Sequence, residues 1–133
     1  MKKRSLVFVF AVLLAMLLAG CSPYVSSYKA LMMVTSNVSD SAYMSFSSLD
    51  GSNVFTLKAK QDGAVLKYSG EVAGSGAATV YYDDDGTKKE LFKLGAGEKV
   101  DDSLTLPQAG KVYVIVETDG ICEDGKFTFD IEE

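Results

Sequence analysis

The sequence predicts an all-β protein, an antiparallel β-sandwich of jelly-roll type with about eight strands, that follows a signal peptide and a short tether. From Ala42 onward, short runs with alternating apolar and polar side chains recur, as is typical of half-buried strands. Breaks rich in Gly, Asp or Pro separate the runs and suit tight turns. The expected strands cover approximately residues 42–49, 53–60, 64–72, 77–83, 87–94, 100–106, 111–118 and 126–132.

The first twenty residues carry an export signal. Lys2, Lys3 and Arg4 follow the initiator methionine, and residues 6–18 are all apolar. Such a run makes about 20 Å of helix, which is short of the ~30 Å hydrocarbon core of a bilayer. A basic start followed by a short apolar run therefore predicts a cleaved signal peptide at residues 1–20 rather than a transmembrane anchor.

The apolar run closes on Leu18-Ala19-Gly20-Cys21, which resembles the lipobox of bacterial lipoproteins. The resemblance implies that Cys21 receives a diacylglycerol thioether, that the chain is cut before it, and that the new amino terminus is acylated. Two or three acyl chains hold a domain to a membrane stably. The expected location is the extracytoplasmic side of the cell membrane, or the outer membrane in a Gram-negative cell. The alternative is a non-lipidated signal peptide that ends near a cysteine.

The mature chain divides into a lipidated N-terminus with a tether, residues 21–41, and a sandwich domain, residues 42–133. Within the tether, residues 31–34 are apolar and form either a first strand or a packing segment. Cleavage removes three of 13 basic residues and none of the 18 acidic ones, so the formal charge falls from −5 to −8. An acidic domain is not attracted to phosphate backbones, which makes nucleic acid a poor partner.

The composition disfavours an enzyme and predicts no catalytic residues and no cofactor. Histidine is absent, which excludes a Ser-His-Asp triad and histidine-based zinc sites. The segment Ser26-Ser27-Tyr28-Lys29 matches the Ser-x-x-Lys pattern of penicillin-binding enzymes, but it lies in the tether of a chain too small for that fold. A glycan hydrolase that uses two carboxylates is a remote alternative.

The acidic segment Asp83-Asp84-Asp85-Gly86 is predicted to be a hairpin turn and not a metal site. Aligning Gly86 with the glycine of an EF-hand places Tyr81 and Phe92 at ligand positions, and neither carries a carboxylate. Weak recruitment of Ca²⁺ by the three aspartates is the alternative. Tyr81 and Tyr82 are adjacent on a strand, so one of them faces outward, either as an ordinary surface side chain or as a platform for a sugar ring.

Residues 112–116 form a strand that is apolar on both sides, because Tyr113 and Ile115 alternate with buried valines. We expect the second face to be covered either by the protein's own chain, as a loop or the N-terminal segment, or by a partner. Cys122 follows this strand and has no second thiol once Cys21 carries lipid. It is predicted to be a buried, inert thiol, with a reactive or intermolecular role as the alternative.

The order of these elements resembles bacterial pre-peptidase C-terminal domains. The residues that carry the likeness are Leu49-Asp50-Gly51, the turn at residues 82–86, the strand at residues 110–117 and the ending at residues 125–131. The resemblance implies a binding or accessory role without catalytic residues. Together with the lipobox, it predicts a lipid-anchored extracytoplasmic module of the bacterial cell envelope, whose partner is an envelope protein or a glycan. A structural or stress-related envelope lipoprotein is the alternative.

Overall fold

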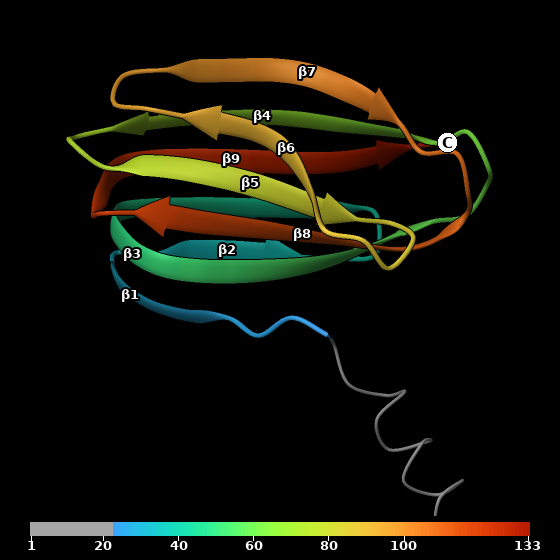
Figure 1. The fold of residues 1–133 in the computed structure, drawn as a ribbon, viewed down its shortest axis with the longest axis horizontal. Helices are drawn as coiled ribbons and strands as arrows, with labels where there is room; N and C mark the ends of the chain where they lie inside the picture. The colour runs from blue at the N-terminus through green and yellow to red at the C-terminus, as the bar shows by residue number, and fades with distance from the viewer. Residues whose placement is uncertain (1–22) are drawn as a thin grey trace, which may run out of the picture.

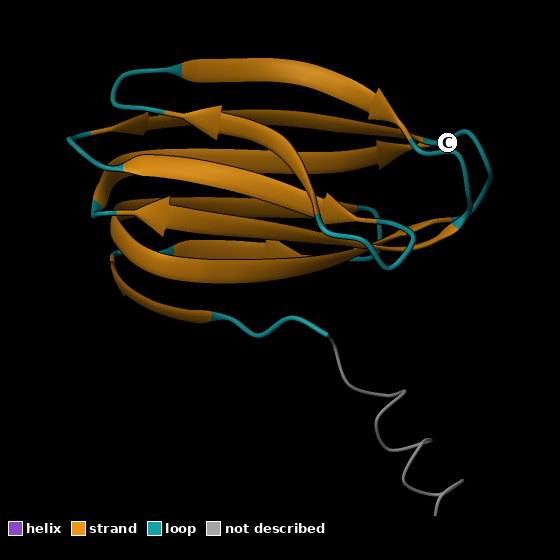
Figure 2. Cartoon of the chain, in the orientation of Figure 1, coloured by secondary structure: helices purple, strands orange, loops and turns teal. Residues whose placement is uncertain are grey.

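The computed structural model describes residues 23–133, and these are organised by nine β-strands (Figures 1 and 2). The predicted signal peptide and Cys21, the predicted lipid attachment site, lie outside the described residues. In the part that is described, no helix is long and apolar enough to cross a membrane. The strands are β1 (Ser27–Leu31), β2 (Val34–Asn37), β3 (Ser41–Ala59), β4 (Val65–Ala73), β5 (Ala77–Asp83), β6 (Lys89–Leu94), β7 (Lys99–Thr105), β8 (Gly110–Asp119) and β9 (Cys122–Glu132).

One long antiparallel ribbon organises the fold. Residues 41–49 of β3 pair with β9, and residues 52–59 of the same strand pair with β8. Since β8 and β9 follow each other in the chain, they form the second half of a single ribbon that folds over near Gly51 (Figure 1). The predicted break at Asp50-Gly51 is therefore wrong as a turn between two strands. It is a bend inside one strand, permitted by the positive φ of Gly51, +132°.

The remaining strands extend the two halves of the ribbon. The hydrogen-bonded order is β6-β5-β8-β3-β9-β4-β7, so β4 and β7 extend the β9 half while β5 and β6 extend the β8 half. Folding the ribbon places these halves face to face as two layers. The predicted all-β antiparallel sandwich is confirmed, with residues 42–133 contributing seven strands rather than eight because two expected strands are one.

Aromatic rings fill the space between the layers. Phe55 of β3 lies 6.0 Å from Phe129 of β9, measured between ring centroids. Phe92 of β6 stacks on Tyr68 of β4 at 5.2 Å and on Phe127 of β9 at 6.2 Å. All five rings are at most 9% exposed, so the alternation that predicted Phe127 and Phe129 to face inward is confirmed. Large aromatic side chains contribute much of the apolar area that a small core buries.

The described part of the expected tether, residues 23–41, belongs to the sandwich instead, and the apolar residues 31–34 lie where β1 ends and β2 begins. Strands β1 and β2 pair antiparallel with the edge of β3 opposite to β8 and β9. In the second half of β3, the backbone N–H groups that point away from β8 have no neighbouring strand. The N-terminal segment accepts their hydrogen bonds instead. An unpaired strand edge costs stability and invites aggregation. The bonds are Val54 N–H to Ser26 Oγ at 2.9 Å, Thr56 N–H to Asn37 Oδ1 at 2.9 Å, Asn37 Nδ2 to the Thr56 carbonyl at 2.8 Å, and Lys58 N–H to the Ser39 carbonyl at 2.7 Å.

Replacing Gly51 by alanine is expected to destabilise the protein more than the same change at Gly86. Both glycines have positive φ, +132° and +97°, so each substitution strains the backbone by about 1–3 kcal/mol. A Cβ at Gly51 would also collide with the Ser27 carbonyl oxygen and lie 2.7 Å from the Tyr28 Cα, whereas nothing lies within 4 Å at Gly86. Urea unfolding measures both variants, and equal losses of unfolding free energy would contradict the role of the bend.

Candidate functional site

The outer face of β8 is covered by the protein's own chain, as one of the two alternatives predicted. Ile115 is only 2% exposed although it points away from the space between the layers. Tyr24, which precedes β1, lies edge-on to the half-buried Tyr113 with ring centroids 5.6 Å apart. This surface is therefore part of the folded domain and is not free to bind a partner.

A partly buried hydrogen bond holds Tyr24 in that position. The Tyr24 hydroxyl donates to Asp83 Oδ2 at 2.7 Å, and Asp83 is 4% exposed. Burial raises the pKa of Asp83. Opposing effects are larger and leave the pKa below its usual value of 3.8: these are hydrogen bonds from Tyr24 and from the backbone of Gly86 and Asp85, and the charge of Lys89. The same hydrogen bond, with burial, raises the pKa of Tyr24 to about 12. The pair is thus a phenol bonded to a carboxylate across the neutral range.

The carboxylates of the acidic turn at residues 83–85 bond to other groups of the protein. Asp83 Oδ1 accepts the N–H groups of Asp85 at 3.1 Å and Gly86 at 2.6 Å, as expected for an Asx-type turn. Lys89 bonds Asp84 at 2.9 Å and Asp85 at 3.3 Å, and these bonds raise the lysine's pKa. The described residues contain no group of three or more Cys, Asp or Glu side chains placed to hold a metal ion.

The tyrosines beside this turn are partly covered by lysines. Lys88 lies over the Tyr81 ring, 4.3 Å from its centroid, and also pairs with Glu117 at 2.7 Å. Lys89 lies 5.1 Å from the centroid of Tyr82. A lysine over an aromatic face is a stabilising cation–π contact, and it occupies the surface on which a sugar ring would stack. These contacts favour the ordinary surface role of Tyr81 and Tyr82 over the alternative of a sugar platform.

Cys122 is a free thiol buried in the core, in agreement with the prediction. It begins β9, opposite Leu49 of β3, and is 0% exposed. Burial, with the charge of Asp50, raises the pKa of the thiol. A buried thiol held in its neutral form is a poor nucleophile, so the structure favours the inert role over the reactive one.

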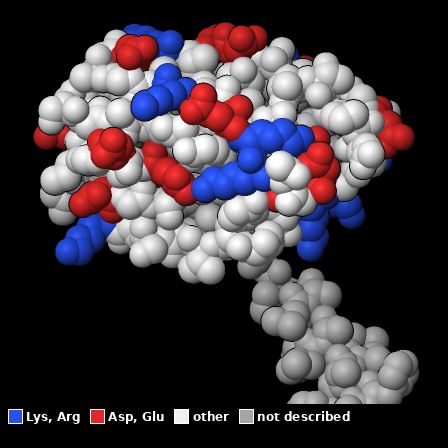
Figure 3. All heavy atoms as spheres, viewed as in Figure 1, with Lys and Arg blue, Asp and Glu red and all other residues white. Residues whose placement is uncertain are grey.

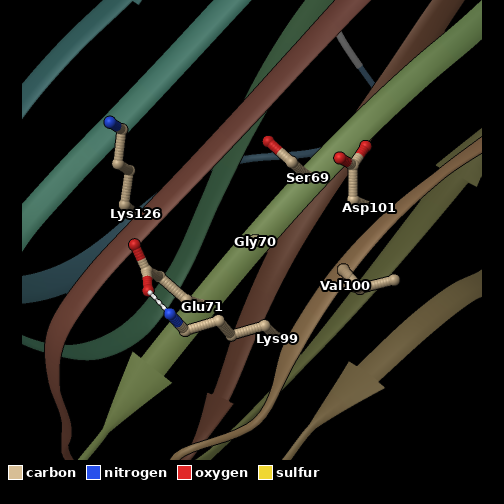
Figure 4. A pocket seen from close by; sticks show the side chains of 7 residues that line it. All are labelled: Ser69, Gly70, Glu71, Lys99, Val100, Asp101 and Lys126. Atoms are coloured by element: carbon tan, nitrogen blue, oxygen red, sulfur yellow. Dashed lines mark ion pairs between the residues drawn. The ribbon is translucent and has the colours of Figure 1, made fainter.

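The best candidate for a binding site lies elsewhere, on the outer face of β9, β4 and β7, and no site was predicted there. A pocket of about 450 Å³ opens on this face (Figure 4). Its walls come from three strands that are distant in the sequence and adjacent in the sheet. The lining residues are Ser69, Gly70 and Glu71 of β4, Lys99, Val100 and Asp101 of β7, and Lys126 of β9.

Cross-strand register arranges these charges in rows. Glu71 stands between Lys99 and Lys126, and its carboxylate pairs with Lys99 at 3.4 Å (Figure 4). Ser69 stands opposite Asp101 in the next row. Two carboxylates and two ammonium groups leave the pocket without net charge. It offers hydrogen-bond donors and acceptors of several kinds and no excess charge for an ionic ligand.

An aromatic ring borders the pocket on β3. Tyr43 is half-buried on the same outer face, opposite Thr128 of β9, which in turn stands opposite Ser69 of β4. Lys126 lies 5.9 Å from the Tyr43 ring centroid and so connects this ring with the pocket. The face therefore combines one aromatic surface with a field of hydroxyl, carboxylate and ammonium groups.

No protein-family model and no curated protein matches the sequence. Among solved structures, the carbohydrate-binding module TmCBM61 in complex with β-1,4-galactotriose aligns over 84% of this chain and 89% of its own, with 12% identity and a TM-score of 0.48. PliG of Aeromonas hydrophila, a periplasmic inhibitor of g-type lysozyme, aligns over 71% and 88%, with 13% identity and a TM-score of 0.41. The C-terminal CBM6 of LamC from Zobellia galactanivorans aligns over 78% and 90%, with 8% identity and a TM-score of 0.41. Likenesses at this level do not identify a ligand for this chain.

Replacing Tyr24 by phenylalanine is expected to lower the free energy of unfolding by about 1.5–3 kcal/mol at neutral pH, because a hydrogen bond to a buried charge is lost while the ring contact with Tyr113 remains. Because folding lowers the pKa of Asp83, its carboxylate stabilises the folded protein above about pH 4. This contribution is lost as the pH falls through the folded-state pKa of Asp83. The difference between the variant and the wild type should therefore shrink towards acid pH. Urea unfolding at about pH 7 and pH 3 tests this, and a loss of the same size at both would contradict it.

Proposed function

We propose that this protein is a lipid-anchored extracytoplasmic module of the bacterial cell envelope that binds a neutral, polyhydroxylated ligand, a glycan, on the outer face of β9, β4 and β7. The observation that carries the proposal is the charge-balanced polar pocket beside Tyr43. Its volume of about 450 Å³ lies within the range of about 300–1,000 Å³ that is typical of small-molecule sites.

The chemistry of the pocket suits sugar hydroxyl groups. A hydroxyl both donates and accepts hydrogen bonds, and the pocket offers acceptors on Glu71 and Asp101 and donors on Lys99 and Lys126. The Tyr43 ring supplies an apolar surface for the C–H face of a sugar, because Lys126 lies 5.9 Å from its centroid, farther than the lysines that lie over Tyr81 and Tyr82. A strongly anionic or cationic ligand would gain little, because charges of both signs alternate in the register of the strands.

The proposal is one of binding without turnover. A general acid needs a carboxyl group whose pKa is raised towards neutrality. Asp83, the acidic residue that is most deeply buried among those described, instead has a lowered pKa and is engaged by Tyr24. In the pocket, the carboxylate of Glu71 is ion-paired with Lys99. Asp83 is therefore not prepared to protonate a leaving group.

The envelope location is supported by the sequence at residues 1–21. A basic start, an apolar run too short to span a bilayer and the lipobox Leu18-Ala19-Gly20-Cys21 occur in the correct order. An acylated Cys21 would stand two residues before Pro23, where the described structure begins. The sandwich would then be held directly at the membrane surface.

Replacing Cys21 by alanine is expected to abolish lipid attachment and leave an uncleaved or soluble precursor, because the thiol is the site of acyl transfer. Labelling of cells with radioactive palmitate, followed by fractionation, measures this. The matched control is Cys122→Ser, which removes the other thiol and should leave labelling intact. Equal labelling of the Cys21 variant and the wild type would contradict the lipid anchor.

Replacing Tyr43 by alanine is expected to weaken binding of a neutral oligosaccharide about two- to tenfold, since loss of one aromatic contact costs about 0.5–1.5 kcal/mol. Titration calorimetry with a tetramer of N-acetylglucosamine, a neutral sugar of the bacterial wall, measures the affinity. Tyr28→Ala is the control, because Tyr28 is an exposed tyrosine on β1, away from the pocket. Unchanged affinity in the Tyr43 variant, or no binding by the wild type, would contradict the proposed site.

A further inference from the structure

The exposed apolar side chains of the described residues are concentrated in one short segment. Apart from Ile121, every large hydrophobic side chain that is exposed there lies between residues 25 and 38. Met32 is 84% exposed, Val25 79% and Leu31 66%. We call these residues the N-terminal strip: Val25, Tyr28, Leu31, Met32, Val34 and Val38 on and around β1 and β2, with Ile121, which lines the same hollow as Leu31.

The strip is also depleted of charge. From residue 23 to residue 39, Lys29 is the sole charged side chain, in a chain where 23% of residues are charged. In the view of Figure 3, the lower margin, where β1 and β2 lie in Figure 1, is largely free of charged groups between basic side chains at its two ends. Exposed apolar side chains that are concentrated in one segment in this way mark an interaction site rather than ordinary scatter.

The position of the strip along the chain indicates which surface it contacts. Val25 is four residues from Cys21 and Met32 is eleven, so at about 3.6 Å per residue they lie within about 14 Å and 40 Å of the acyl chains. We propose that the N-terminal strip lies on the lipid bilayer into which the acylated Cys21 is inserted. This inference rests on the proposed lipid anchor.

Charge supports the same orientation. The mature chain carries a formal charge of −8, so most of its surface is repelled by anionic lipid headgroups. No carboxylate occurs between residues 23 and 39, where Lys29 is the one charge; Asp50 of β3, which stands opposite Lys29, is the carboxylate that lines the same hollow as Leu31. A long lysine side chain can keep its ammonium group among the headgroups while neighbouring apolar side chains enter the interface.

Docking by the strip would present the candidate site to the envelope. In the half of the sandwich that holds the pocket, β2 and β7 are at opposite ends of the order β2-β3-β9-β4-β7. Figure 1 shows β1 and β7 at opposite margins of the domain. With β2 at the membrane, the wall of the pocket formed by β7 would face away from the lipid.

A site-specific fluorescent probe tests the docking. The lipidated protein is reconstituted in vesicles, with an environment-sensitive dye attached to Met32→Cys or, as the matched control, to the exposed Asp102→Cys on β7. Cys122 is buried and should not take the dye; labelling of the wild type checks this. Penetration of the interface by about 5–10 Å predicts a blue shift and at least about threefold stronger quenching by brominated lipids at position 32 than at position 102.

Three results would overturn the proposal, and they differ from one another. If the protein floats with the vesicles and both probes behave alike, the lipid anchor stands and the docking is wrong. If the probe at position 32 is shielded from water in a concentration-dependent way without quenching by lipid, the strip binds a second copy of the chain. If neither variant floats with the vesicles, the lipid anchor itself is wrong and the docking falls with it.

Discussion

The bend of the β3 ribbon near Gly51 is the constraint on which the rest of the structure depends. It divides one continuous strand between two layers, and it brings β8 and β9 onto the same edge of that strand. Every other strand then joins by pairing with a ribbon half or with a strand already placed there. The aromatic contacts from Phe55 to Phe129 and from Phe92 to Phe127 form only because the bend stacks the halves.

The same bend leaves two surfaces that need cover, and the N-terminal segment covers both. One is the outward edge of β3 at residues 54–58, where Ser26, Asn37 and Ser39 occupy the backbone donors. The other is the outer face of β8, where Tyr24 packs on Tyr113 and is held by Asp83. Apart from Tyr24 and Met33, which are partly buried, the large apolar side chains of the segment stay exposed, and these form the N-terminal strip.

The strand pattern of the fold could be predicted because alternation and turn residues are local signals. The two layers and the buried Phe127 and Phe129 followed from them. The continuity of β3 through Asp50-Gly51 could not be predicted, because the same dipeptide suits a turn and a bend. The bounds of β1 and β2 could not be predicted, because strands of five and four residues are too short to show a clear alternation; the apolar residues 31–34, expected to be a first strand or a packing segment, join the two. The pocket was missed because its residues meet only through the pairing of β9 with β4 and of β4 with β7, which no local signal specifies.

Amide hydrogen exchange of the mature protein tests the account most directly, because the account makes the N-terminal segment part of the sandwich. The N–H groups of Val54, Thr56 and Lys58 face the strand edge that the segment covers. They are predicted to exchange as slowly as those of Phe55 and Leu57, which face β8, and Asn37→Ala should speed exchange mainly at Thr56. The contrary result is rapid exchange at residues 54, 56 and 58 of the unmodified sequence while residues 55 and 57 stay protected. It would show that this edge of β3 is free and the N-terminal segment detached, and it would contradict the account.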